Sequence, residues 1–153
     1  MAMRTSSRRA FSLLELLAVI TLIGILSSIV IARNGRTLLG NFGAQADCRR
    51  LSLDLLRAQR LSITTGENHF IQFPATTGKG ITYRLRRRTA TGVQNVESRT
   101  LGEDVSITAS HTVMEFTFEG QALGAYQITL AGNARSWQMN VVPITGAMQV
   151  TEL

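Results

Sequence analysis

The hydrophobic pattern divides the chain into three stretches with different periods. Residues 11–32 are apolar except for one charge, Glu15. At about 1.5 Å per helical residue this stretch measures roughly 33 Å, enough to cross the hydrocarbon core of a bilayer. Residues 33–66 repeat apolar positions mostly three and four apart, which predicts an amphipathic helix that ends at Gly66. Phe42 and Ala46 are expected on its apolar face, and Asp54 on its polar face. After Gly66 the period changes to two.

The period of two predicts antiparallel strands with one buried and one exposed face. Glycine-containing turns separate the strands, and we interpret Thr77-Gly78-Lys79-Gly80 as one of these hairpin turns. Helices do not alternate with the strands, which argues against a nucleotide-binding α/β fold. The predicted class is α+β, a long N-terminal helix packed on an antiparallel sheet. The expected strands are 69–73, 81–88, 93–101, 105–109, 114–118, 126–130, 135–142 and 147–150.

Charge and potential ligand residues narrow the function further. The net charge is +6, but Arg4, Arg8 and Arg9 supply three of those charges, so the basic character belongs partly to the N-terminus. The single Cys48 permits no internal disulfide. His69 and His111, the two histidines, have no carboxylate or cysteine at ligand spacing. We therefore expect no enzyme, no metal and no cofactor.

Three interpretations compete for the first 32 residues. A secretory signal peptide would have a shorter apolar region and a cleavage site after it, and Ala32-Arg33-Asn34 provides no convincing site. A simple membrane anchor fits the length, and the leading arginines would keep the N-terminus in the cytoplasm. The anchor does not explain Glu15, because a carboxylate in the membrane costs about 2.5–3.5 kcal/mol on insertion scales.

The third interpretation explains the acid. Residues 8–15 read Arg-Arg-Ala-Phe-Ser-Leu-Leu-Glu and precede an apolar run. This resembles the class III leader of type IV pilins and type II secretion pseudopilins. The resemblance implies cleavage by a prepilin peptidase between Ala10 and Phe11, N-methylation of Phe11, and retention of Glu15. The family usually has glycine where Ala10 stands. In a filament, Glu15 could pair with the Phe11 ammonium of a neighbouring subunit and so fix the axial register.

This resemblance and the periodicity together give a domain plan. Residues 1–10 are a leader peptide, 11–32 a transmembrane and filament-core helix, 33–66 an amphipathic helix, and 67–153 a periplasmic β domain in a pilin-like fold. The partners implied are other pilin or pseudopilin subunits, the prepilin peptidase and methyltransferase, and lipids of the bacterial inner membrane.

Further stretches resemble the GspH/FimT-type minor pseudopilins: residues 47–66, 116–120, 126–130 and 146–150. That resemblance implies a minor subunit of a type II secretion pseudopilus, which helps to drive protein export. One alternative is a minor type IV pilin, used in pilus assembly or DNA uptake. The other is a membrane-anchored periplasmic binding domain that never polymerises.

A cluster of arginines lies within the strand expected at 81–88. Arg84, Arg86 and Arg88 would share one face of this strand. They form either a solvated face opposed by Glu67 or Glu97, or an anion-binding surface for an acidic subunit, lipid headgroups or nucleic acid. The C-terminal segment after residue 142 contains no arginine, which makes nucleic acid the weaker alternative.

Overall fold

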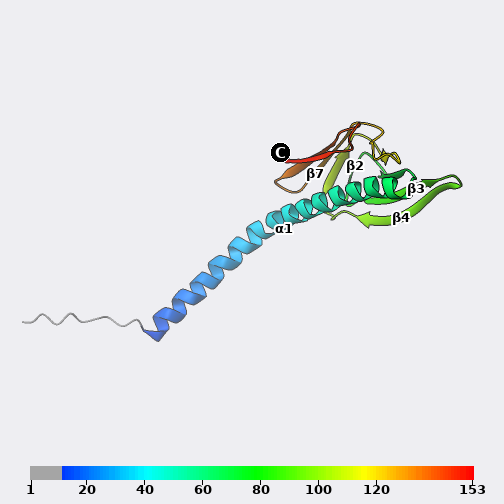
Figure 1. Ribbon diagram of the computed structural model, residues 1–153. Helices are drawn as coiled ribbons and strands as arrows, with labels where there is room; N and C mark the ends of the chain where they lie inside the picture. Colours follow the sequence, from blue (N-terminus) through cyan, green and yellow to red (C-terminus); the bar gives the residue numbers. More distant parts are fainter. Residues whose placement is uncertain (1–11) are drawn as a thin grey trace, which may run out of the picture. The chain divides into compact units, whose positions relative to one another are not determined.

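The computed structural model describes residues 12–153, with side chains for 12–32 and 42–153. The chain divides into two compact units, one ending at Arg36 and the other comprising Thr37–Leu153. A single helix, α1, runs from Leu13 to Thr65 (Figure 1). Nine strands follow it in the described chain: β1 His69–Gln72, β2 Thr77–Lys79, β3 Thr82–Thr89, β4 Gly92–Thr100, β5 Ser106–Ala109, β6 Val113–Phe116, β7 Tyr126–Ala131, β8 Ser136–Val141 and β9 Met148–Glu152.

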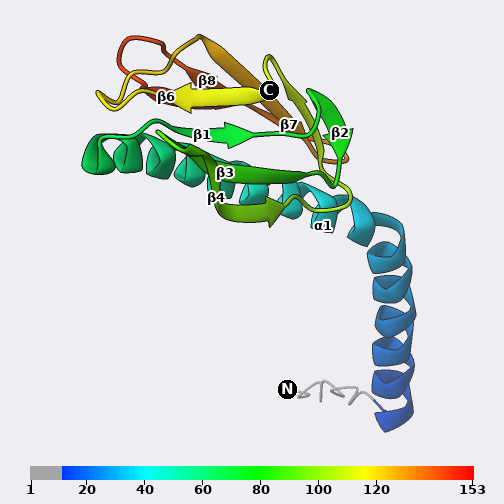
Figure 2. The same cartoon turned by 90° about the vertical axis from the view of Figure 1, so that its right-hand side faces the viewer.

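The strands form two antiparallel sheets in the second unit. One has four strands in the order β4-β3-β1-β6, and the other has five in the order β2-β5-β7-β8-β9. Figure 2 shows the C-terminal part of α1 lying along β3 and β4. The α+β class and the predicted arrangement of a long helix on antiparallel sheet are therefore confirmed.

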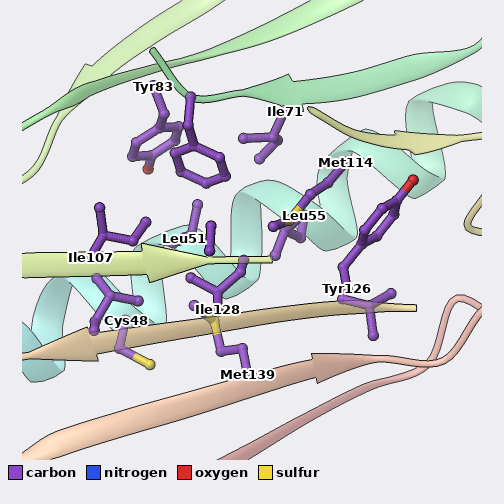
Figure 3. Close-up of a cluster of buried hydrophobic side chains, with 14 of the residues drawn as sticks. Cys48, Leu51, Leu55, Ile71, Tyr83, Ile107, Met114, Tyr126, Ile128 and Met139 are labelled. Atoms are coloured by element: carbon purple, nitrogen blue, oxygen red, sulfur yellow. The ribbon is translucent and has the colours of Figure 1, made fainter. Parts of the chain in front are cut away.

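The core lies between the helix and both sheets. Figure 3 shows side chains from α1, from β1 and β3 of the first sheet, and from the second sheet meeting in one cluster. Leu51 and Leu55 of α1 are fully buried there, as are Ile71 of β1, Ile128 of β7 and Met139 of β8. Because one continuous cluster joins all three layers, the part of α1 after Arg36 and both sheets form one folding unit.

The buried face of α1 repeats at helical spacing, as the amphipathic pattern predicts. It contains Ala44, Cys48, Leu51, Leu55 and Ala58. The helix ends before Gly66, whose φ of 70° is the left-handed conformation that a glycine adopts readily after a helix.

Three positions of the amphipathic prediction are wrong. Phe42 and Ala46, expected on the apolar face, are exposed, Phe42 at 67%, whereas Asp54, expected on the polar face, is buried. Asp47 is buried on the same face. Side-chain hydrogen bonds across the interface explain this burial and are described below.

All eight expected strands are present, with ends that differ by two residues or fewer. The exception to the prediction is Thr77–Lys79, interpreted as a turn but present as β2. Thr77 and Lys79 pair with Thr108 and Ser106 of β5 at the edge of the sheet. Three residues are too few to show an alternating pattern, so the sequence did not predict this strand. The turn itself is at Gly80, where φ is 56°.

Candidate functional site

The N-terminus of α1 is organised by Ser12. Its side-chain Oγ accepts a hydrogen bond from the Glu15 backbone N–H at 3.1 Å, and its carbonyl oxygen accepts one from Leu16 N–H at 3.2 Å. Ser12 is therefore the N-cap, and the Ser-x-x-Glu spacing is that of a capping box. The expected processing residues Ala10 and Phe11 lie outside the described residues.

Glu15 lies in the first turn of a fully exposed apolar helix. Residues Leu13–Ala32 have a mean hydropathy of 2.5 and are long enough to cross a membrane. The hydroxyls of Thr21 and Ser28 donate to the carbonyl oxygens of Ala18 and Gly24, at 2.9 and 2.8 Å. These bonds satisfy two polar groups that would otherwise face hydrocarbon. Within the described chain, the Glu15 carboxylate has no such partner.

The arginine cluster occupies β3, on the sheet face opposite α1. Arg88 makes a bidentate ion pair with Glu115 of β6, with Nε–Oε1 and Nη2–Oε2 distances of 3.0 and 2.9 Å. Its guanidinium also lies 5.4 Å from the ring centroid of Phe70. This arginine, with help from Asn68, holds the pKa of the buried Glu115 carboxyl below its usual range. The charge of Arg88 is therefore already matched within the domain.

The other two arginines of the cluster have no carboxylate partner among the described residues. Arg86 is half-buried and donates from Nη1 to the Gln72 side-chain oxygen at 2.6 Å. Arg84 is exposed and lines a groove of about 240 Å³ together with Gln72, Phe73, Pro74 and Thr82. The acids expected to oppose the cluster lie elsewhere, because Glu67 pairs with Arg87 and Glu97 pairs with Arg57 and Arg99.

Two buried aspartates attach α1 to the sheets. The carboxylate of Asp54 accepts a hydrogen bond from the Tyr83 hydroxyl at 2.7 Å and lies 3.5 Å from Arg99 Nε. Burial and the negative charge of Asp54 raise the pKa of Tyr83 well above its usual value. One heptad earlier, Asp47 accepts from the Gly102 backbone N–H at 2.7 Å. The two bonds hold the helix against the hairpin formed by β3 and β4 and against the loop that follows it.

The two histidines and the cysteine make contacts that are typical of structural residues. His69 is buried, and its Nδ1 lies 2.9 Å from the Glu67 carbonyl oxygen. His111 contacts the Ser110 hydroxyl and packs edge-on against Tyr126. Burial raises the pKa of the Cys48 thiol, which keeps it in the unreactive form. The described residues contain no group of three potential metal ligands.

Comparison with known proteins finds one sequence motif and several similar folds. Residues 5–31 match the prokaryotic N-terminal methylation motif. The fold is similar to that of the minor pseudopilin EpsH from the type 2 secretion system of Vibrio cholerae, with a TM-score of 0.56 and 13% identity over 73% of this chain and 95% of that one. The predicted pilin-like fold is therefore confirmed.

Two crystal structures of the Pseudomonas aeruginosa type IV minor pilin FimU are also similar to this pilin-like chain. One has a TM-score of 0.57 and 13% identity over 70% of this chain and 91% of that one. The other has a TM-score of 0.56 and 12% identity over 80% of this chain and 92% of that one. A search of curated proteins found no match.

Sequence reasoning missed several residues that shape the pilin-like chain. The Ser-x-x-Glu signature before the apolar run could have identified Ser12 as the N-cap. Asp47 and Asp54 are spaced by one heptad, which could have placed them on one helix face. The pairing of Arg88 with Glu115 had no sequence signal. It depends on the strand order, in which β1 lies between β3 and β6 and brings them close together.

Proposed function

We propose that this pilin-like chain is a minor pseudopilin of the GspH/FimT type, a structural subunit of a type II secretion pseudopilus. Glu15 supports the proposal most directly, because it places a carboxylate without a described partner in an exposed apolar helix. Such an acid is stabilised in hydrocarbon when a cation meets it. A neighbouring subunit can supply that cation.

The processing steps create the cation. Cleavage between Ala10 and Phe11 gives Phe11 a free α-amino group, and N-methylation leaves it basic. The ammonium of one subunit and the Glu15 carboxylate of the next then attract each other as the helices pack in parallel. The subunit is held in the inner membrane, with its N-terminus cytoplasmic and its β domain periplasmic, until it joins the filament.

A second surface fits the same function. The outer side of α1 carries the apolar side chains of Leu53, Leu56 and Ile63, which are partly exposed in the second unit. Leu53 and Leu56 line a shallow groove with Arg57 and Arg60. An exposed apolar helix face of this kind marks a protein contact. In a filament, it would meet the helices of neighbouring subunits.

The decisive experiment examines the mature chain from cells that produce it. Mass spectrometry should find a chain that begins with N-methylated Phe11, and an N-terminus still at Met1 would contradict the proposal. Glu15→Ala should be cleaved normally but should enter filaments poorly. Leu14→Ala is the matched control, since it alters an adjacent apolar residue and leaves the carboxylate in place. Unchanged secretion and piliation in cells that carry Glu15→Ala would favour a non-polymerising anchor.

The system served by the filament is tested by deletion. We expect loss of exoprotein secretion with normal surface piliation, and Glu15→Ala should reproduce that loss. The alternative, a minor type IV pilin, is favoured by the resemblance to FimU and predicts the opposite pattern, with defective piliation or DNA uptake and normal secretion.

We also propose that the free part of the arginine cluster binds an anionic group. Arg84 and Arg86 remain unmatched by described carboxylates, and Arg84 opens onto a groove. Two free cations suit a single acidic side chain of a neighbouring subunit better than a nucleic-acid backbone, which requires several phosphate contacts. Arg84→Gln should weaken binding of the full-length chain to an acidic heptapeptide at low salt, and Arg88→Gln should change it less. Equal losses for the two variants would contradict the assignment.

A further inference from the structure

The two sheets of this domain end in four edge strands, and three of them are protected against the addition of another strand. The pairing of β4 with β3 shifts register between Leu85 and Arg86, which is the signature of a β-bulge. Strand β2 has only three residues. The outer edge of β6 is covered, because Leu123 N–H donates to the Glu115 carbonyl oxygen at 3.0 Å. Bulged, short and covered edges are the usual protections against edge-to-edge association.

The fourth edge, β9, has none of these protections. It pairs with β8 in unbroken register from Met148↔Val141 to Glu152↔Trp137. It contains neither proline nor lysine, and no described residue pairs with its outer side. β9 is the last strand of the five-stranded sheet and ends one residue before the C-terminus (Figure 1).

Two hydrogen bonds at its ends show which backbone groups are open. Val142 N–H donates to the Ala147 carbonyl oxygen, and Leu153 N–H donates to the Ser136 carbonyl oxygen, both at 2.9 Å. In an antiparallel ladder, hydrogen-bonded residues alternate with residues whose backbone groups point away. The N–H and C=O groups of Met148, Val150 and Glu152 therefore point to the open edge.

The side chains of the same three residues lie beside Val141, Met139 and Trp137, which are all buried. The Glu152 carboxylate lies 3.2 Å from Arg135 Nη1, so only Met148 and Val150 extend the core toward this edge. Val150 is nevertheless 49% exposed, since no strand lies beyond it. The opposite face of β9 carries Gln149 and Thr151 and is polar.

We infer that the β9 edge is an interaction surface that receives an extended strand from a different polypeptide in the filament, an inference that rests on the proposed function. The incoming strand pairs its backbone with Met148, Val150 and Glu152. Its residues alternate, with apolar side chains that cover Val150 and extend the core, and polar side chains beside Gln149 and Thr151.

A second copy of the chain is the less suitable occupant. Two β9 strands could pair about a two-fold axis with Val150 opposite Val150, but this self-complementary contact closes a dimer. A growing filament requires a contact that does not close. The pairing would also set the Glu152 carboxylate opposite the apolar Met148.

The test compares two substitutions at one position of the full-length chain, in cells that assemble the filament. Val150→Pro removes an N–H that points outward and leaves the hydrogen bonds to β8 in place, as proline on an edge strand can. Val150→Thr keeps both the N–H and the branched shape. We expect Val150→Pro to fold, to be processed before Phe11 and to enter filaments much less than Val150→Thr, which should behave as wild type.

Amide hydrogen exchange on the wild-type chain gives a second readout that requires no variant to fold. On assembly, exchange at Met148, Val150 and Glu152 should slow by at least about tenfold, while Gln149 and Thr151 are protected in both states. Unchanged exchange at the three outward amides, or normal assembly of Val150→Pro, would overturn the inference. Protection that appears in the isolated subunit and disappears on dilution would also overturn it, in favour of a dimer.

Glu15→Ala separates this inference from the proposed function. If Glu15→Ala fails to assemble while Val150→Pro assembles normally, the filament function stands and the β9 inference fails. If both variants assemble normally, the proposed role of Glu15 fails as well, and absence of the wild-type chain from filaments would contradict the proposed function itself.

Discussion

Buried carboxylates in this protein each have a specific donor, and Glu115 has the most complete set. Its two oxygens receive the guanidinium of Arg88, and Oε1 also accepts from the Asn68 side-chain amide at 2.9 Å. Asp54 similarly accepts a hydrogen bond from the Tyr83 hydroxyl, and Asp47 accepts one from the Gly102 backbone N–H. Removing one partner of such a buried group leaves the other without compensation, so these contacts are sensitive to substitution.

The Glu115 pair predicts a pH dependence of stability. Its pKa in the folded chain lies below the value in the unfolded chain, so acid protonates the unfolded chain first. The stabilisation is therefore present above the unfolded pKa of about 4.3 and is lost as the pH falls through the lower, folded pKa. We expect Glu115→Gln to cost about 1–3 kcal/mol at pH 7 and less at pH 3.

Urea unfolding at a series of pH values measures this difference. Glu119→Gln is the matched control, because Glu119 is exposed and close in sequence, and it should change the free energy of unfolding by about 0.5 kcal/mol or less. A Glu115→Gln loss that is equally large at both pH values would show that packing, and not charge, accounts for the effect.

At the scale of secondary structure, periodicity predicted most elements and failed where tertiary contacts decide. The alternation in 126–130 and in 137–141 predicted β7 and β8, because each strand has one buried face and one face that is half-buried or exposed. β2 was missed, since its short pairing with β5 creates no pattern of its own. Asp54 was assigned to the wrong face because its burial depends on Tyr83, which is 29 residues away.

The same limit applies to the candidate site. The leader motif could be predicted because it is local, and the alternation placed Arg84, Arg86 and Arg88 on one face of β3. Which of these arginines is free could not be predicted, because the partner Glu115 approaches through the strand order β3-β1-β6. The open edge at β9 could not be predicted either, because it depends on the order of all five strands in its sheet.

Leucine-to-alanine substitutions on the two faces of α1 should have different effects, one on stability and the other on assembly. Leu55→Ala removes a fully buried side chain and should cost about 2–5 kcal/mol of unfolding free energy. Leu53 is 64% exposed, so Leu53→Ala should change that free energy by about 0.5 kcal/mol or less. If the outer face contacts neighbouring subunits, Leu53→Ala should nevertheless reduce incorporation into filaments. Urea unfolding and quantitative immunoblotting of filament fractions measure the two effects, and normal incorporation of Leu53→Ala would argue against a contact there.

At the scale of the whole molecule, the burial pattern separates the apolar helix from the folding of the domain. Every described side chain from 12 to 32 is exposed, whereas the buried core begins at Ala44. We therefore expect residues 37–153 to fold alone in buffer, with a free energy of unfolding within about 1 kcal/mol of that of the full chain in detergent. A chain starting at residue 50 is the control, because it lacks Ala44, Asp47 and Cys48 and should be clearly less stable. Cooperative urea unfolding of the two truncated chains measures this, and an unfolded 37–153 chain would mean that the domain depends on the first unit for its stability.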